Sequence, residues 1–141
     1  MENNKQKTFV AIKPDATSRK LIGQIITRFE NLGFNLLGLK LMRVSRELAE
    51  KHYGEHKGKP FFEDLVAFIT SGPIVAMAWE GQNAVEITRK TLGATDPAKA
   101  NAGTIRGDFG TSIAENIMHA SDSPDSAERE LNLFFPEGFI V

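Results

Sequence analysis

The chain alternates short apolar runs with amphipathic segments, and this alternation restricts the possible fold more than any other feature of the sequence. Apolar residues recur at helical spacing from Leu21 to Leu32, and Gly33 then ends the helix that they predict. Four other runs have the length and composition of strands: residues 8–13 (TFVAIK), 34–44 (FNLLGLKLMRV), 74–80 (IVAMAWE) and 115–119 (ENIMH).

Capping residues mark the remaining helices. We expect helices at 45–53, capped by Ser45; at 61–70; at 84–92, capped by Asn83 and closed by Gly93; and one opened by Ser123-Pro124. Without the short helices the order is βαββαβ, which predicts a ferredoxin-like α/β sandwich of the α+β class. In it helices cover a four-stranded antiparallel sheet, and we place them on one face. Gly38 predicts a bulge in its strand, and the irregular segment 93–110 predicts a functional loop.

The bulk composition excludes several classes of protein. The chain has 141 residues, of which 41% are apolar and 25% charged, enough for one globular domain with a core. A net charge of −1 argues against a general nucleic-acid surface, and the lack of cysteine excludes disulfides and thiolate metal sites. The first residues are polar, unlike a secretory signal, and the apolar runs are too short to cross a bilayer. We therefore expect a cytoplasmic protein without a membrane partner.

The segment NIMHASD, residues 116–122, holds the residue with the clearest chemical potential. His119 follows a strand and precedes small residues that leave room around its ring. A neutral imidazole is a nucleophile, and its second nitrogen can be oriented by a partner. The alternative is a structural histidine at a strand end, which is the more common role of a single histidine.

Residues elsewhere in the chain favour the chemical interpretation. Lys13, Arg89 and Arg106 are cations that can hold phosphate oxygens, whereas Ser121 and Glu130 can orient an imidazole. Two of them have a simpler explanation: a strand-ending turn at Lys13-Pro14-Asp15 and a solvated helix face at Arg89. The sequence has no GxxxxGK[ST] loop, so side chains must build any phosphate site.

His52 and His56 are four residues apart on a possible helix, which suggests a metal pair. No third ligand with a matching motif accompanies them, so we reject zinc. We expect no direct protein ligand for a metal ion.

Five segments together resemble the nucleoside diphosphate kinase family, and the likeness extends from Thr8 to Gly138. It implies one domain of this type over residues 1–141. It also implies ping-pong transfer, in which a nucleoside triphosphate phosphorylates a histidine and a nucleoside diphosphate then accepts the phosphoryl group. The segments are KPDA (13–16), HYGEHKGKPFF (52–62), RKTLGATDP (89–97), GTIRGDFG (103–110) and NIMHASD (116–122).

The resemblance assigns roles to individual positions. His119 corresponds to the nucleophile, held by Glu130 with Ser121 in the same network. The positions that match the nucleotide-binding residues of the family contact sugar hydroxyls (Lys13 and Asn116), phosphates (Lys13, Tyr53, Arg89, Thr95 and Arg106) or the base (Phe61 and, less strongly, Leu65 and Ile113). We expect Phe61 to face outward and Phe62 to lie in the core.

The resemblance further implies Mg²⁺, held mainly by nucleotide phosphates, with ATP and other nucleoside tri- and diphosphates as partners. It also implies a homo-oligomer, either a tetramer or a hexamer. Two alternatives remain. One is a non-catalytic nucleotide-binding or regulatory protein on the same fold, although such a protein would be expected to have lost His119, Lys13 or an arginine. The other, a nucleic-acid-binding module, lacks a basic excess and an aromatic-rich strand motif.

Overall fold

The structure is a computed structural model that describes residues 3–140. It contains a four-stranded antiparallel sheet with the strand order β2-β3-β1-β4. The strands are β1 (Lys5–Ile12), β2 (Asn35–Met42), β3 (Ile74–Gln82) and β4 (Met118–Ala120). The helices are α1 (Pro14–Ser18), α2 (Ile22–Asn31), α3 (Arg46–His52), η1 (Gly54–His56), α4 (Phe62–Ile69), α5 (Ala84–Leu92), η2 (Pro97–Lys99), α6 (Ile105–Phe109) and α7 (Pro124–Phe134). The predicted βαββαβ order is confirmed.

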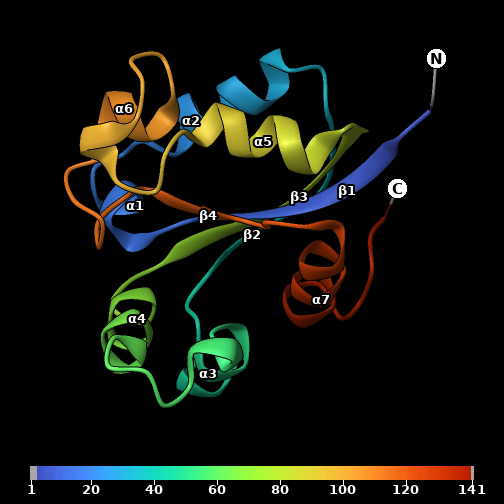
Figure 1. Ribbon diagram of the computed structural model, residues 1–141. Helices are drawn as coiled ribbons and strands as arrows, with labels where there is room; N and C mark the ends of the chain where they lie inside the picture. The colour runs from blue at the N-terminus through green and yellow to red at the C-terminus, as the bar shows by residue number, and fades with distance from the viewer. Residues whose placement is uncertain (1–2, 141) are drawn as a thin grey trace.

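Helices cover both faces of the sheet, so the expectation that they lie on one face is wrong. Figure 1 shows α2, α5 and α6 on one side of the sheet and α3, α4 and α7 on the other. Along β1, Phe9 and Ala11 belong to one core cluster while Val10 and Ile12 belong to the second. Because successive side chains of a strand point to opposite faces, a strand buried on both sides must be apolar at every position. The unbroken apolar runs in the sequences of β1 and β3 therefore indicate that both faces of the sheet are covered.

Several local predictions hold. Ser45 accepts a hydrogen bond from the Leu48 amide, and Ser123 accepts one from the Ser126 amide, so both serines cap their helices. The register of β2 against β3 shifts between Leu36 and Gly38, which confirms the bulge. A Cβ at Gly38 would lie 2.7 Å from the ring of Phe135, so glycine also permits this close packing.

Other local predictions need correction. Asn83 adopts a left-handed conformation with φ 52°, and its side chain accepts from Asn4 Nδ2 instead of capping α5. Gln6 Oε1, from β1, accepts the Val85 amide in the first turn of that helix. The segment 93–110 is not irregular throughout, since it contains η2 and α6. The fourth strand spans 118–120 rather than 115–119, because the chain turns sharply at Ile117.

No helix among residues 3–140 is long and apolar enough to cross a membrane.

Candidate active site

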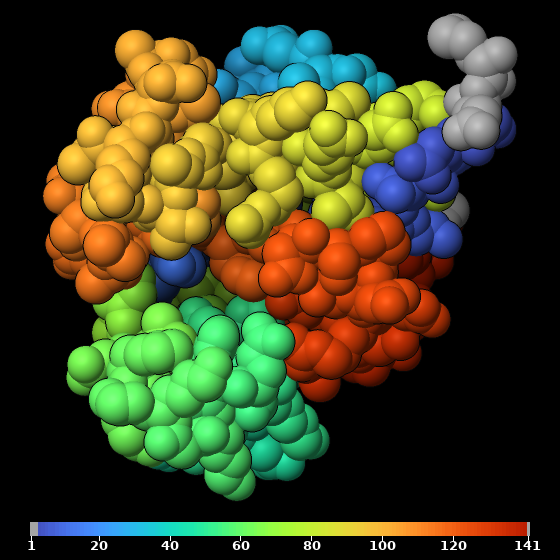
Figure 2. All heavy atoms as spheres, viewed as in Figure 1, coloured from blue at the N-terminus to red at the C-terminus, as the bar shows by residue number. Residues whose placement is uncertain are grey.

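A cavity of about 560 Å³ opens between the α3–α4 side of the molecule and the segment that precedes β4. Figure 2 shows this hollow between the green atoms of α3 and α4 and the yellow-orange atoms of the 94–116 segment. Ten of the twelve site residues predicted from the sequence line it, and Ser121 and Glu130 lie behind His119. The ten are Lys13, Tyr53, Phe61, Leu65, Arg89, Thr95, Arg106, Ile113, Asn116 and His119.

His119 is held at the cavity wall by a buried network. On β4 it pairs with Ala11 of β1, whose side chain lies on the α3–α4–α7 face of the sheet. Its Nε2 lies 2.8 Å from Glu130 Oε2 on α7, and Ser121 Oγ donates to Glu130 Oε1 at 2.6 Å. Ser121 is fully buried, which keeps water from competing for this carboxylate. The network fixes the imidazole ring and leaves Nδ1 as the nitrogen that Glu130 does not engage.

A strained turn immediately precedes β4. Ile117 has φ 80°, and the Met118 amide donates to Asn116 O at 3.0 Å, which is the i→i+2 bond of a γ-turn. A positive φ is unfavourable for a β-branched residue, at a cost of about 1–3 kcal/mol. Asp15 Oδ2 accepts the Ile117 amide at 3.0 Å, and the Lys13 amide donates to Ile117 O at 2.8 Å. Contacts from the end of β1 therefore hold a turn that puts both Asn116 and His119 at the cavity.

Two arginines border β4, the edge strand that carries His119. Arg106 Nη2 donates to Met118 O at 2.7 Å, and Arg89 Nη1 donates to Ala120 O at 3.2 Å. These carbonyls are two residues apart and lie on the same side of the strand. The arginines thus satisfy acceptors that an edge strand would otherwise expose. The same contacts place both guanidinium groups beside the imidazole.

Three cations line the cavity, and the charges of Asp15 and Asp122 act on Lys13 and Arg89 respectively. Arg106 also donates to Asn116 O and Gly93 O, both at 3.2 Å, and Lys13 Nζ donates to Asn116 Oδ1 at 2.9 Å. Within residues 3–140, no ion pair includes Lys13, Arg89 or Arg106. Burial, and then the charge of Arg106, lowers the pKa of Lys13 to about 8. Burial, and then the charge of Arg89, lowers the pKa of Arg106 to about 10, so both groups remain mainly charged at neutral pH.

The outer part of the cavity is apolar. The Phe61 side chain is exposed (45%), whereas that of Phe62 is buried (5%), as expected from the sequence. Phe61 contacts the His56 ring edge to face at a centroid distance of 5.2 Å, and Ile113 is exposed at the same opening. An aromatic face beside an aliphatic group forms a slot that a flat ring can enter.

Tyr53 and Thr95 complete the polar wall. Tyr53 is buried, and this burial, with a smaller contribution from Glu130, raises the pKa of its hydroxyl to about 12. Thr95 O accepts from Asn116 Nδ2 at 3.1 Å, so the Asn116 amide connects Lys13 to the loop that holds Thr95. Lys13, Asn116 and Thr95 therefore form a hydrogen-bonded chain along this wall.

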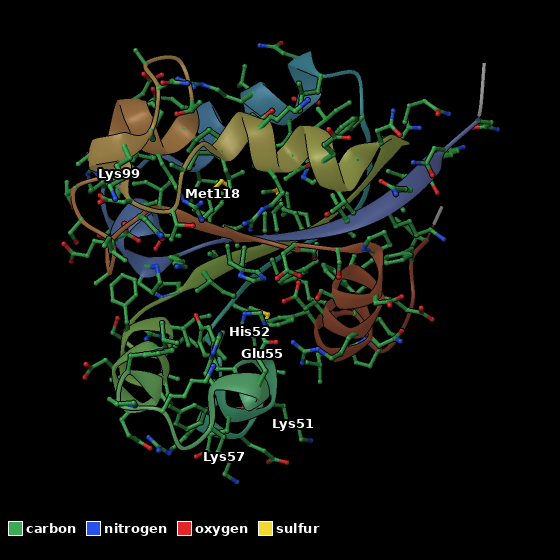
Figure 3. The ribbon with its side chains drawn as sticks, in the orientation of Figure 1. Lys51, His52, Glu55, Lys57, Lys99 and Met118 are labelled. Carbon is green, nitrogen blue, oxygen red and sulfur yellow. The ribbon has the colours of Figure 1, made fainter. Side chains whose placement is uncertain are left out.

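His52 is a site residue that we did not predict from the sequence. It is 3% exposed, its ring lies 4.6 Å from that of His119 in a T-shaped arrangement, and its Nδ1 lies 3.8 Å from Glu130 Oε2. In Figure 3 it lies between α3 and the sheet, whereas Lys51 and Lys57 point outward. His56 does not share this position, because α3 ends at His52 and η1 follows. The sequence signal was its place in the HYGEHKGKPFF segment, directly before Tyr53.

Comparisons with known proteins agree with this geometry. The family model for nucleoside diphosphate kinase matches residues 6–140. A nucleoside diphosphate kinase of Thermosynechococcus vestitus is 62% identical over 136 residues, which cover 96% of this chain and 91% of the relative. One of Carboxydothermus hydrogenoformans is 60% identical over 132 residues, covering 94% and 89%.

Among solved structures, a halophilic nucleoside diphosphate kinase from Halobacterium salinarum in complex with CDP superposes with a TM-score of 0.94 and 48% identity. That match covers 99% of this chain and 93% of the other. Identity at this level over nearly the whole length shows the family and its enzymatic character. The chain belongs to the nucleoside diphosphate kinase family of phosphotransferases.

Proposed function

We propose that this enzyme transfers the terminal phosphoryl group of a nucleoside triphosphate to a nucleoside diphosphate by a ping-pong mechanism through His119. The observation that carries the proposal is the orientation of His119. Glu130 accepts a hydrogen bond from Nε2–H, so the lone pair of the neutral ring resides on Nδ1. Three cations that form no ion pair within residues 3–140 line the same cavity.

In the first half-reaction, the Nδ1 lone pair forms an N–P bond with the terminal phosphorus. The bond from that phosphorus to the bridging oxygen breaks, and its electron pair leaves with the nucleoside diphosphate. The imidazole gains positive charge as the N–P bond forms, and the Glu130 carboxylate 2.8 Å from Nε2 stabilises that charge. Arg89 and Arg106, fixed beside β4, stabilise the negative charge on the transferring phosphoryl oxygens.

In the second half-reaction, a terminal oxygen of another nucleoside diphosphate attacks the same phosphorus. The N–P bond breaks and its electron pair returns to Nδ1, which restores the enzyme. Because phosphohistidine is a high-energy phosphoramidate, each half-reaction is nearly balanced, and one cavity serves donor and acceptor in turn.

We also propose broad specificity for base and sugar. The Phe61 ring has no hydrogen-bonding group, so it can stack on every base without distinguishing their edges. The family resemblance assigns the sugar hydroxyls to Lys13 and Asn116, which are joined by a hydrogen bond, and ribose and deoxyribose share one of those hydroxyls. These features support a site that accepts many nucleotides.

Kinases of this family generally need a divalent cation. We propose Mg²⁺, held mainly by nucleotide phosphates; once bound, it neutralises phosphate charge. Mg²⁺ prefers oxygen ligands, and nucleotide phosphates supply them. Among residues 3–140, the one cluster of three metal-type side chains includes two imidazoles, which suit other metals.

We further propose the homo-oligomer, a tetramer or hexamer, that the sequence resemblance implies. Strand β2 lies at an edge of the sheet. It exposes Leu36, Leu39 and Leu41 by 41%, 46% and 67%. An edge strand with exposed leucines favours pairing with another chain.

The direct test is to incubate the purified protein with radiolabelled ATP and Mg²⁺. We expect an acid-labile phosphoprotein that passes its label to added GDP or CDP, and no such label on His119→Ala. An acid-stable label, or a labelled intermediate in the His119 variant, would refute the mechanism.

A further inference from the structure

His52, His119 and Glu130 bring three metal-ligating groups together behind the cavity wall. They come from α3, β4 and α7, and one ligand atom of each lies within 4.8 Å of the other two. Two imidazole nitrogens and one carboxylate oxygen form the ligand set of many zinc sites that keep a fourth position open. The catalytic network alone requires His119 and Glu130, but it does not account for His52.

We propose that this triad is a binding site for a transition-metal ion of the Zn²⁺ class, and that the bound ion switches phosphoryl transfer off. The site is separate from the Mg²⁺ that accompanies the nucleotide. The inhibitory half of the proposal rests on the function proposed above, whereas metal binding itself does not.

The distances already approach those of a metal site. With bonds of about 2.0–2.2 Å, neighbouring ligand atoms in a tetrahedral zinc site lie about 3.3 Å apart. The separation of His119 Nε2 from Glu130 Oε2 is 2.8 Å, and that of His52 Nδ1 from the same oxygen is 3.8 Å. One separation must widen and the other must narrow, each by about half an ångström. The ligand nitrogens of His52 and His119 lie within 4.8 Å of each other and must also approach.

The buried ring nitrogens of His52 indicate that the ring binds a ligand. Both ring nitrogens are buried, and neither has a hydrogen-bond partner within the described part of the chain. A buried polar group without a partner costs roughly 1–3 kcal/mol, so native structures seldom leave one unsatisfied.

A hydrogen bond from Ser121 also orients the carboxylate of the triad. Ser121 Oγ donates to Glu130 Oε1, which leaves Oε2 directed at the two imidazoles. Hydrogen bonds of this kind orient ligating carboxylates in metal sites. The partly exposed His119 provides the entry path, because it alone of the three lines the cavity. Arg129 Nη2, 3.9 Å from Glu130 Oε2, opposes a cation, so we expect reversible binding.

Metal binding and phosphoryl transfer exclude each other through one proton. A neutral imidazole has one nitrogen with a lone pair and one with a proton. When the metal takes the lone pair of His119 Nε2, the proton must reside on Nδ1. Nδ1 then cannot attack phosphorus. The same ion also engages the Glu130 oxygen that supports the ring during transfer.

The test measures metal binding without nucleotide, by calorimetry with Zn²⁺ and by the visible absorption of Co²⁺ in a four-coordinate site. His52→Phe removes one ligand and retains a flat ring beside Phe9 and Phe134. His56→Ala is the matched control, since His56 lines the cavity but lies outside the triad. We expect one ion per chain in the wild type and in His56→Ala, and at least about tenfold weaker binding in His52→Phe.

The activity arm adds Zn²⁺ in the presence of excess Mg²⁺ and expresses each rate relative to the same variant without zinc. We expect inhibition of the wild type and of His56→Ala, reversed by a chelator selective for Zn²⁺, and strong resistance in His52→Phe. If His52→Phe does not fold, Glu130→Gln provides the binding measurement instead.

Two results would overturn the proposal: no one-to-one binding by the wild type, or equal binding by the triad variant. Failure of the phosphoprotein test with intact zinc binding would instead refute the proposed mechanism alone.

Discussion

Phe61 and Phe62 are neighbours with the same side chain, and we predict opposite consequences when each is replaced by alanine. Phe61 is 45% exposed at the cavity opening, whereas Phe62 is 5% exposed and belongs to the core cluster of α3, α4 and α7. Stacking of a base on an aromatic ring contributes about 1–3 kcal/mol. Phe61→Ala should therefore weaken all nucleotides by roughly 5- to 150-fold, with purines losing somewhat more because they stack over a larger area.

Phe62→Ala should lower the stability of the protein more than Phe61→Ala does. Full burial of a phenylalanine side chain contributes about 1.5–3 kcal/mol, so the half-exposed Phe61 contributes about 1 kcal/mol. Its edge-to-face contact with His56 adds about 0.5 kcal/mol or more. Phe62→Ala instead leaves a cavity in the core, at about 3–5 kcal/mol. For a chain of this length, roughly 4 °C of melting temperature corresponds to each kcal/mol.

The assay measures KM for ADP, GDP, CDP and dTDP together with the melting temperature of both variants. We expect Phe61→Ala to raise the four KM values by similar factors with a small change in Tm. Phe62→Ala should lower Tm by more than about 10 °C. A large loss of Tm in Phe61→Ala with unchanged KM values would show that Phe61 is a core residue and that the base binds elsewhere.

The other predictions concern the phosphate site and the assembly. His119→Ala should lower kcat on the order of a millionfold and leave the circular-dichroism melt nearly unchanged; full activity would refute the nucleophile. Arg89→Ala and Arg106→Ala should each lower kcat far more than they raise KM, and a change confined to KM would assign them to ground-state binding. Arg106→Ala should also lower Tm more than Arg89→Ala, because Arg106 donates to three carbonyls and Arg89 to one.

Because the pKa of Lys13 falls from 10.5 to about 8 on folding, kcat/KM should decline above about pH 8 as this charge is lost. The unfolded chain binds more protons than the folded chain between about pH 8 and 10.5, so the Lys13 contribution to stability rises across that window. A kcat/KM profile that stays flat to pH 10 would contradict this assignment. Leu41 is 67% exposed, and Leu41→Glu should dissociate the assembly while preserving the fold. Light scattering measures the mass of the assembly, and an unchanged mass would show that β2 does not belong to the interface.

The parts of the fold that could be predicted from the sequence depend on local patterns. The strands of residues 8–13 and 74–80 and the caps at Ser45 and Ser123 follow from spacing and residue type alone. The two-sided cover of the sheet was missed, although uninterrupted apolar strands indicate it. Asn83 was misassigned because its side chain forms a hydrogen bond with Asn4, 79 residues earlier in the chain. Capping rules consider only neighbouring residues, so they do not predict this partner.

In the candidate site, too, sequence motifs predict residues, but they do not predict features that depend on contacts between segments distant in sequence. The family resemblance supplied most of the residues that line the cavity, but no pattern near Ile117 predicts its positive φ. That conformation exists because Asp15 and Lys13 bind the turn across more than 100 residues of sequence. His52 was missed for a related reason: its position beside Glu130 depends on how α3 and α7 pack on the sheet.

These features share one physical consequence: the site includes several groups that do not stabilise the free protein. Ile117 is strained, the lowered pKa of Lys13 reduces protein stability at neutral pH, and His52 has no polar partner among residues 3–140. The surrounding sheet and helices can hold them because both core clusters are extensive and well buried. A ligand that brings negative charge to Lys13, Arg89 and Arg106 supplies ion-pair partners that these three cations do not find within residues 3–140. The free energy gained there is available for binding and for stabilising charge in the transition state, which explains why Lys13 and Arg106 are buried and fixed without an ion pair in that part of the chain.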